Sequence, residues 1–259
     1  MADLLLEFER KMTTINNHFY NDLADEWWTA TDHMVCFLRD ESVIKLNYLK
    51  EQVKDLRGKR VLDLGAGAGF VSIPLSEQDC EVVALDLAPN ALETLKEKAQ
   101  ERGVSQRITI KTGDVLELDP DWLESFDLVL AYDILEHIEE PEKLLLNAFQ
   151  YLKPGGKFFY HTLNQTWQCA LVYLWLVPNL IKRSPPDLHI QRLNLKPELI
   201  SDWLIEIGFL PIEQIGIYAP PWQQGVWELL TTRTVKTPIR FEYTSDLSLG
   251  YLGYAEKRE

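Results

Sequence analysis

The stretch Val61-Leu-Asp-Leu-Gly65-Ala-Gly-Ala-Gly69 decides the fold, because a short apolar run leads directly into three glycines at alternate positions. Glycine lets a backbone turn tightly and approach a ligand closely, and such a loop commonly joins a strand to the N-terminus of a helix. We therefore predict a nucleotide-type loop after the first strand of a parallel sheet. The residues of this loop expected to bind a ligand are Asp63, Gly65, Ala66, Gly67 and Gly69.

Downstream of the loop, short apolar runs alternate with helical stretches, which is typical of βαβ units and a parallel sheet. Strands are predicted over residues 60–64, 81–86, 108–112, 128–132 and 157–162. The clearest helix covers residues 89–102, since proline favours a first helical turn and Gly103 favours a helix end. A turn is expected at residues 153–156.

The two ends of the chain complete the predicted domain. After an apolar insertion, a helix is predicted over residues 196–207, followed by strands over 211–218 and 226–232 that bring the count to seven. Residues 13–28 show helical periodicity, with Thr13 or Thr14 as the N-cap, and residues 255–259 are expected to be disordered. The prediction is a Rossmann-like α/β domain over residues 58–259, preceded by a helical segment (1–57) and carrying a lid insertion at about 166–195.

Composition excludes several classes of protein. The 259 residues include 26 basic and 40 acidic ones, and a net charge of −14 argues against a nucleic-acid substrate. Cys36, Cys80 and Cys169 have no CxxC spacing, so neither a disulfide framework nor a thiolate zinc site is indicated, and a cytoplasmic location is expected. The N-terminus lacks the basic region and long apolar run of an export signal.

Acidic residues lie at the ends of three successive predicted strands. Asp63 lies within the first strand, Asp86 ends the second about 20 residues after the loop, and Asp114 follows the third. Asp86 is placed to accept both hydroxyls of a ribose, and Asp114 to accept a hydrogen bond from an adenine amino group. Aspartate also caps helices after strands, but the three acids together with the glycine loop favour a ligand site.

Two kinds of cofactor use such a loop. A dinucleotide site prefers the spacing G-x-G-x-x-G, and here Phe70 stands where the third glycine is expected. Asp63 instead suits a cationic ligand such as S-adenosylmethionine (SAM), which carries a sulfonium and an amino group and no pyrophosphate. A SAM site is therefore favoured over a nicotinamide dinucleotide site.

The ordered motifs VLDLGAGAG, ALDLAPNAL, TGDV, FDLVLAYDILEHI and LKPGG resemble those of class I SAM-dependent methyltransferases over about residues 59–162. The resemblance implies SAM as the cofactor and a seven-stranded sheet whose last strand is antiparallel. Leu87, Val115 and Tyr132 are also expected to contact the cofactor.

Asp133, Glu136 and His137 follow the fourth strand at positions i, i+3 and i+4, which would share one face of a helical turn. Two carboxylates and an imidazole suit Mg²⁺, Mn²⁺ or Zn²⁺, and such an ion would bind a catechol and orient its oxygen. Alternatively, His137 alone acts as a general base, since the unperturbed pKa of histidine is about 6.5. The simplest alternative is a capped helix with a solvated polar face.

Nearly the whole chain resembles the ubiquinone-biosynthesis O-methyltransferases. The segments that carry the resemblance are FYNDLADEWW near the N-terminus, HTLNQT at residues 161–166 and DLHIQRLNLKPELI further on. It implies a divalent-metal site at Asp133, Glu136 and His137. His161, Asn164 and His189 are expected on the substrate side.

Three positions depart from the pattern of this family. Asp133 stands where the family has glutamate, His161 stands where it has serine, and residues 34–38 (MVCFL) replace its Leu-His. We therefore expect a different wall on one side of the acceptor site. His18 and His33 are interpreted as surface or helix-packing residues.

Residues 167–181 (WQCALVYLWLVPNLI) are unusually apolar, but these fifteen residues include Pro178 and are fewer than the roughly 20 that span a bilayer. Trp167, Tyr173 and Trp175, with cationic residues directly after the segment, are typical of a segment that lies on a membrane surface. A buried lid helix over the pocket fits the same composition. Peripheral membrane contact through this segment and a lipid-like acceptor are therefore expected.

These features together predict an O-methyltransferase that transfers the SAM methyl group to a hydroxyl of a polyprenylated catechol or phenol in ubiquinone biosynthesis. Two alternatives stay open: a methyltransferase of the same fold with another small-molecule acceptor, and a SAM-binding protein without turnover. The intact glycine loop argues against the second. A dehydrogenase is disfavoured by Phe70, and no oligomeric state is indicated.

Overall fold

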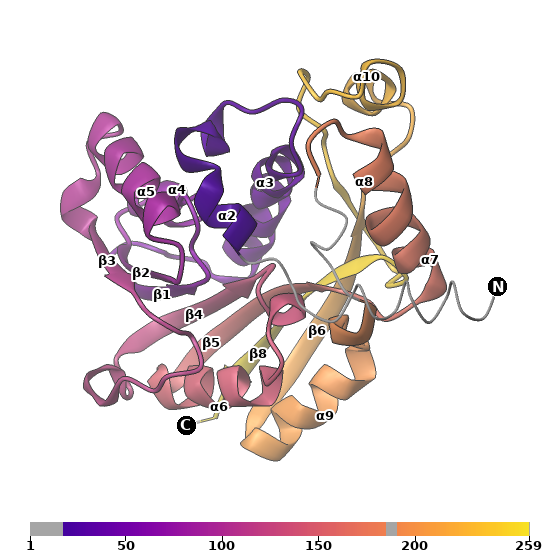
Figure 1. The fold of residues 1–259 in the computed structure, drawn as a ribbon. Helices are drawn as coiled ribbons and strands as arrows, with labels where there is room; N and C mark the ends of the chain where they lie inside the picture. The colour runs from indigo at the N-terminus through magenta and orange to yellow at the C-terminus, as the bar shows by residue number, and fades with distance from the viewer. Residues whose placement is uncertain (1–17, 185–190, 259) are drawn as a thin grey trace.

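A computed structural model of the chain describes residues 18–184 and 191–258, which fold around one twisted sheet (Figure 1). Within these residues the sheet has eight strands in the order β3-β2-β1-β4-β5-β8-β6-β7. The strands are β1 (Arg60–Leu64), β2 (Glu81–Asp86), β3 (Ile108–Thr112), β4 (Phe126–Tyr132), β5 (Leu152–Leu163), β6 (Phe209–Tyr218), β7 (Glu242–Thr244) and β8 (Gly250–Lys257). The first five strands pair in parallel, and β8, β6 and β7 continue the sheet in antiparallel pairings.

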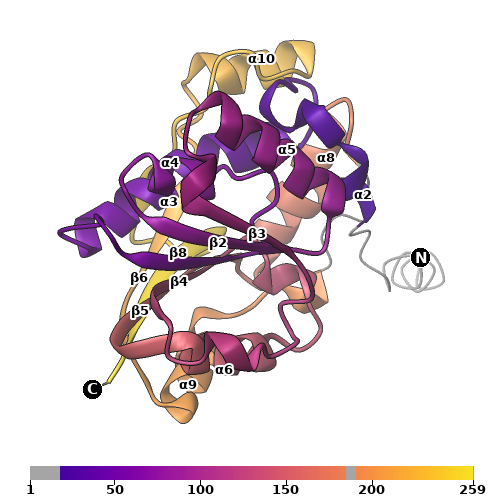
Figure 2. The ribbon, with the colours of Figure 1, turned by 90° about the vertical axis from the view of Figure 1, so that its left-hand side faces the viewer.

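Helices cover both faces of the sheet (Figure 2). On one face lie α3 (Val35–Gln52), α4 (Ser72–Ser76) and α5 (Pro89–Glu101), and on the other lie α6 (Pro141–Tyr151) and α9 (Pro197–Ile207). The short α2 (His18–Asp22) and the 3₁₀ turn η1 (Ala24–Trp28) pack against α5. Further 3₁₀ turns are η2 (Ser105–Arg107), η3 (Pro120–Trp122), η4 (Leu135–His137) and η6 (Gln191–Leu193).

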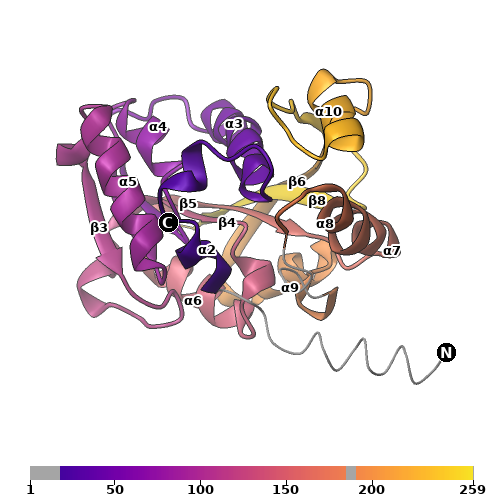
Figure 3. The same cartoon turned by 45° about the horizontal axis from the view of Figure 1, so that its top comes forward.

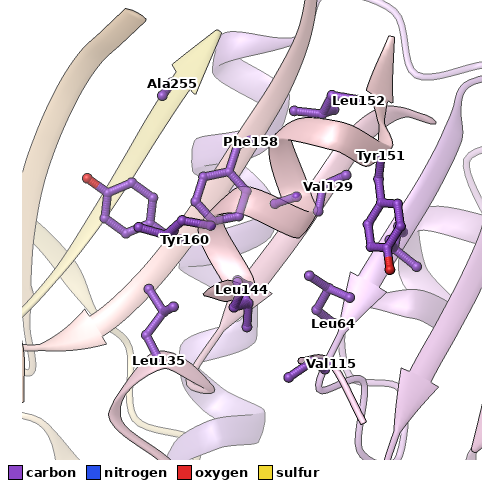
Figure 4. Packing of buried hydrophobic residues seen from close by; sticks show 14 of the residues in the cluster. Leu64, Val115, Val129, Leu135, Leu144, Tyr151, Leu152, Phe158, Tyr160 and Ala255 are labelled. Carbon is purple, nitrogen blue, oxygen red and sulfur yellow. The ribbon is translucent and has the colours of Figure 1, made fainter. Parts of the chain in front are cut away.

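Apolar clusters fill the space on both sides of the sheet. Figure 4 shows Val129, Phe158 and Tyr160 from β4 and β5 in the cluster that also contains Leu144 of α6. The intervening residues of the same two strands, such as Phe159, point to the opposite cluster with Tyr48 of α3. Because successive strand residues face opposite layers, and both layers are apolar, these strands appear in the sequence as unbroken apolar runs.

The first five strand predictions are confirmed, and so are the strand beginning near residue 211 and the helices over residues 89–102 and 196–207. Gly208 ends α9 in the left-handed region, with φ of 115°. The turn expected at residues 153–156 is present as an irregularity within β5, where the partner of Phe126 is Leu152 but that of Leu128 is Lys157. Thr13 and Thr14 lie outside the described residues.

The strand predicted over residues 226–232 is wrong, because these residues belong to α10 (Gln224–Thr232). Val226, Leu229 and Leu230 have the i, i+3, i+4 spacing of a helix, and the β-branched and aromatic residues of the segment obscure it. The last strand is instead β8, which lies antiparallel between β5 and β6. The prediction of disorder from residue 255 is also wrong for residues 255–257, since Ala255 is fully buried within β8.

The apolar insertion forms an arm built from α7 (Trp167–Cys169), the π-helical η5 (Ala170–Leu176) and α8 (Val177–Leu180). The arm lies beside α10 (Figure 3), and Val177 and Ile181 share an apolar cluster with Leu229 of α10. Arg233, which follows α10, donates hydrogen bonds to the carbonyl oxygens of Leu180 and Asn179. In the part of the chain that the structure describes, no helix combines the length and the apolar character needed to cross a membrane.

Candidate active site

A cavity of about 410 Å³ opens at the carboxyl ends of β1, β2 and β4. This is the edge at which open parallel sheets bind their ligands, and the volume suits a nucleoside-sized molecule. Its wall contains most of the residues that the sequence assigned to the cofactor: Asp63, Gly65, Ala66, Gly67, Asp86, Leu87, Asp114, Val115 and Tyr132. Gly69 is not part of the wall. A Cβ there would lie 2.7 Å from Leu95 Cγ, so Gly69 serves the packing of the loop against α5.

The glycine loop has the backbone that the sequence predicts. Gly65 and Gly67 have φ of 77° and 50°, in the left-handed region that favours glycine. A Cβ on Gly67 would lie 3.1 Å from the Trp27 ring. Asp86 Oδ2 accepts the Gly67 N–H at 2.7 Å, and its other oxygen accepts the Ala88 N–H at 2.8 Å. One carboxylate therefore holds both the glycine loop and the turn after β2.

The electrostatics of this cavity favour a cationic ligand. Burial raises the pKa of Asp63 to about 6, although its carboxylate accepts a hydrogen bond of 2.6 Å from Ser72 Oγ. Burial also raises the pKa of Asp86, against the hydrogen bonds from Ala88 and Gly67. A positively charged group beside these acids would stabilise their ionised forms, whereas a pyrophosphate would repel them. The cavity thus fits the sulfonium and amino group of SAM.

The N-terminal segment forms one wall of the cavity, which the sequence did not reveal. Tyr20 of α2, Trp27 of η1 and Lys45 of α3 all line it. Trp27 Nε1 donates to the carbonyl oxygen of Tyr20 at 3.2 Å, and Trp28 Nε1 donates to that of Ala68 in the loop at 3.0 Å. The sequence showed helical periodicity and a family resemblance in this segment, and neither indicates where a helix packs.

A second, smaller cavity of about 30 Å³ adjoins the first, and Tyr20, Leu38 and Asp133 line both. Its other residues combine apolar or aromatic side chains with ionisable ones: Met34, Phe37, Leu163, Tyr173, Glu41, Glu136 and His161. The cavity therefore places ionisable groups where an acceptor next to the cofactor would lie.

Asp133 lies where the two cavities meet, and it lines both of them. Its φ of 56° turns the chain sharply after β4, and its carboxylate accepts hydrogen bonds from Lys45 Nζ and His161 Nδ1. Lys45 Nζ also donates to Glu41 Oε2 at 3.1 Å. Burial alone would raise the pKa of Asp133, but Lys45 and His161 outweigh it and hold that pKa well below its usual range.

Glu136 and His137 lie on η4, and their side chains contact different residues. Glu136 Oε2 accepts a hydrogen bond of 2.9 Å from Thr162 Oγ1, and burial, helped by Asp133, raises its pKa to about 8. His137 Nε2 lies 3.4 Å from the Tyr20 hydroxyl oxygen. Burial lowers the pKa of His137 to about 4, against the opposite effect of Asp133, so the imidazole is neutral at neutral pH.

The structure does not bring the predicted metal ligands Asp133, Glu136 and His137 together. The expected helical face is absent, since Asp133 is in the left-handed region and a 3₁₀ turn follows. Within residues 18–184 and 191–258, the candidate ligand atoms that lie within 4.8 Å of one another belong to Glu41, Asp133 and His161. The residue set that the resemblance implies therefore does not fit a metal ion.

The remaining predicted residues have separate locations. His161 lines the smaller cavity, whereas Asn164 lines neither and donates from Nδ2 to the carbonyl oxygen of Leu247 at 2.7 Å. His33 is buried and its Nδ1 accepts the Val35 N–H at the start of α3, which confirms its interpretation as a packing residue. His189 and the side chain of His18 lie outside the described residues.

The fold and the cavity together define a class of protein: a Rossmann-like enzyme of the class I methyltransferase type, with a SAM-type cofactor site. A family model described as a methyltransferase domain matches residues 55–195, more than half of the chain. The chain belongs to this methyltransferase-domain family, and it is a SAM-dependent methyltransferase.

Individual relatives agree with this assignment. A ubiquinone biosynthesis O-methyltransferase of Coxiella burnetii is 24% identical over 233 residues, covering 90% of this chain and 91% of the relative. One of Xanthomonas euvesicatoria is 28% identical over 235 residues, covering 91% of this chain and 90% of the relative. Among solved structures, a magnesium protoporphyrin IX methyltransferase from Synechocystis with bound S-adenosylhomocysteine superposes with a TM-score of 0.59 at 18% identity, covering 85% of this chain and 83% of that one.

Asp86→Ala is expected to weaken binding of S-adenosylhomocysteine at least about tenfold, because the variant loses the hydrogen bond to Gly67 and the carboxylate that the sequence predicts as the ribose acceptor. Calorimetric titration measures this affinity. Glu93→Ala, at an exposed position of α5 outside the cavity, is the matched control and should bind like the wild type. Normal affinity in a folded Asp86→Ala protein would mean that another group holds the ribose.

Glu136→Gln is expected to change how stability depends on pH. Between the ordinary glutamate pKa of 4.5 and about 8, the folded protein keeps the Glu136 proton and the unfolded chain loses it, so this group's contribution to stability falls as pH rises. Because glutamine does not titrate, the variant does not lose stability in this way as the pH rises. Its free energy of unfolding relative to wild type should therefore rise from about pH 5.5 to about pH 7.5, by at most roughly 1.4 kcal/mol per pH unit. Urea unfolding measures the difference, and a difference independent of pH would contradict the raised pKa.

Proposed function

We propose that this protein transfers the SAM methyl group to a hydroxyl of a lipid-like catechol or phenol, as a polyprenylated intermediate of ubiquinone biosynthesis would offer. The observation that carries the proposal is the smaller cavity beside the cofactor cavity, whose lining combines Phe37, Leu163 and Tyr173 with ionisable groups. A ring that carries an apolar chain and hydroxyl groups matches this mixture of apolar and ionisable side chains. The names of the relatives from Coxiella and Xanthomonas support the same acceptor class.

The chemistry divides between the cofactor and the chain. SAM supplies a methyl carbon on a sulfonium, so that attack by a hydroxyl oxygen breaks the carbon–sulfur bond and releases S-adenosylhomocysteine. The cavity walls hold the two reactants in line, which accounts for most of the rate gain. His137 receives the hydroxyl proton, since burial keeps it neutral. Its low pKa is sufficient because the oxygen becomes strongly acidic as its bond to the methyl carbon forms.

A metal-assisted methyl transfer, in which Mg²⁺, Mn²⁺ or Zn²⁺ would bind the acceptor oxygens, needs protein ligands that point toward one ion. Asp133, Glu136 and His137 turn to Lys45, Thr162 and Tyr20 respectively. We therefore favour proton transfer to His137 over a metal-bound acceptor.

The arm formed by residues 167–181 supports a lipid-like acceptor and peripheral membrane contact. Trp167 and Trp175 are 69% and 59% exposed, whereas Tyr173 between them lines the smaller cavity. One segment thus connects an exposed aromatic surface with the acceptor site, as an amphipathic interfacial helix would. Arg183 forms ion pairs with Glu26 and Asp32, and Lys182 beside it is exposed at the end of the arm.

The volume of the smaller cavity favours a second candidate, a compact phenolic acceptor without a chain. The smaller cavity has a volume of only about 30 Å³, so a ring with a prenyl chain requires a larger movement of the arm or of Tyr20 than a compact ring does. A comparison of acceptors with and without a prenyl chain distinguishes the two candidates.

The purified protein is expected to transfer label from methyl-labelled SAM to a short-chain prenylated catechol, with kcat/KM at least about tenfold higher than for the catechol without its chain. Such a ratio corresponds to about 1.4 kcal/mol of transition-state binding by the chain. Label in the organic extract is counted. A higher kcat/KM for the unprenylated catechol would favour the compact acceptor, and labelling of neither, with S-adenosylhomocysteine binding intact, would refute transfer to catechols.

The control for this assay is His137→Ala, which should keep cofactor binding and lose turnover by at least about a hundredfold. Wild-type turnover in this variant would remove His137 from the mechanism without affecting the acceptor assignment.

Replacing both Trp167 and Trp175 with alanine is expected to lower sedimentation with phosphatidylcholine and phosphatidylglycerol vesicles at least about tenfold, because exposed tryptophans supply the interfacial contact. Ile205→Ala is the control, since Ile205 is an equally exposed apolar residue on α9, away from the arm. Equal sedimentation of wild type and the double variant would contradict membrane contact through the arm.

A further inference from the structure

Lys45 is a buried lysine whose position no sequence motif explains. It lies in the middle of α3 and is 1% exposed, and its side chain reaches the wall of the cofactor cavity. A lysine is rarely this buried unless its charge is paired. Here Nζ donates to Glu41 Oε2 at 3.1 Å and to Asp133 Oδ2. The ammonium therefore lies between two carboxylates that come from α3 and from the end of β4.

The same two carboxylates belong to the group whose atoms could hold a metal ion. Glu41, Asp133 and His161 each place one candidate ligand atom within 4.8 Å of the others, and all three line the smaller cavity. Asp133 uses one oxygen for His161 Nδ1 and the other for Lys45. Two of the three candidate ligands are thus already bound to a cation of the chain itself.

We propose that the Lys45 ammonium takes the place of a divalent cation at the acceptor end of this active site. Lys45 acts as a positioning residue: its charge fixes the Asp133 carboxylate, which in turn orients His161 beside the acceptor cavity. A divalent ion at Glu41, Asp133 and His161 would lie next to a buried positive charge, and the repulsion at that distance in a poorly solvated site opposes its binding. The role in positioning an acceptor rests on the proposed methyl transfer, whereas the exclusion of metal does not.

The charges of the ionisable groups at this site predict what removal of the ammonium would do. Glu41 and Asp133 bring two negative charges when ionised, Lys45 brings one positive charge, and Glu136 faces the same cavity from η4. Removing the ammonium would leave two adjacent carboxylates and an imidazole nitrogen facing one another. This is an oxygen-rich ligand set with one imidazole, which suits Mn²⁺.

Mn²⁺ binding to the complete chain, followed by the electron paramagnetic resonance signal of free Mn²⁺, tests this proposal without any acceptor. The wild type is expected to show no saturable Mn²⁺ site. Lys45→Met, which removes the charge and shortens the side chain by one atom, should show a saturable Mn²⁺ site with an affinity at least about tenfold above any residual binding to the wild type. Adding His161→Ala to Lys45→Met should abolish that gain.

Two controls separate charge removal at this site from general effects. Lys257→Met removes another buried, paired lysine, one that contacts Glu124 and the carbonyl oxygen of Leu152 outside the cavities, and it should not create a Mn²⁺ site. Lys45→Arg keeps the positive charge and should exclude Mn²⁺ as the wild type does. Circular dichroism establishes that each variant is folded.

Saturable Mn²⁺ binding to the wild type that is lost in His161→Ala would overturn the proposal, and this measurement does not depend on the folding of Lys45→Met. Failure of a folded Lys45→Met protein to gain Mn²⁺ affinity would overturn it as well. These Mn²⁺ measurements involve neither SAM nor a phenol. They can therefore refute the exclusion of metal while methyl transfer to a catechol is observed, or support it while no transfer is observed.

Discussion

The ion pair between Lys45 and Asp133 is the contact on which the organisation of the active site depends. It joins α3, which precedes the sheet in sequence, to the carboxyl end of β4 across a separation of 88 residues. Lys45 is buried and Asp133 is half-buried, and each has a further partner, Glu41 for Lys45 and His161 for Asp133. A buried ion pair contributes little net stability, but removing one partner leaves an unpaired charge, so it fixes the position of α3 over the sheet.

The position of α3 determines the shape of both cavities. Leu38 and Lys45 bring α3 against the cofactor cavity, while Phe37 and Glu41 of the same helix face the smaller one. The two cavities meet at Asp133, where the chain leaves β4 in a left-handed conformation. Cofactor and acceptor would therefore be held by a single helix and a single strand end, an arrangement that limits the relative motion of two reactants.

Burial sets different charge states for neighbouring groups in this site. Asp133 stays ionised because cationic and imidazole groups surround it, whereas burial raises the pKa of Glu136 to about 8 and lowers that of His137 to about 4. Near neutral pH the site thus has one carboxylate, one protonated carboxyl and one neutral imidazole within a few residues of chain. In the cofactor cavity, Asp63 is buried and Asp86 is half-buried, and their carboxylates accept hydrogen bonds from Ser72 and from backbone N–H groups. A positively charged ligand would stabilise the ionised forms of both acids.

The sequence by itself determined the parallel half of the sheet, the glycine loop and the acids at its edge. These features depend on local patterns: apolar runs of strand length, glycines where φ is positive, and the rule that parallel strands end at one edge, which brings Asp63, Asp86 and Asp114 into one cavity. Only the tertiary structure decided that residues 224–232 form a helix, since a short apolar segment rich in aromatic and β-branched residues fits either state until packing selects one. It also brought Lys45 and Glu41 to Asp133 and turned Glu136 and His137 away from it. Such contacts between distant segments follow from how α3 packs on the sheet, and no spacing in the sequence encodes them.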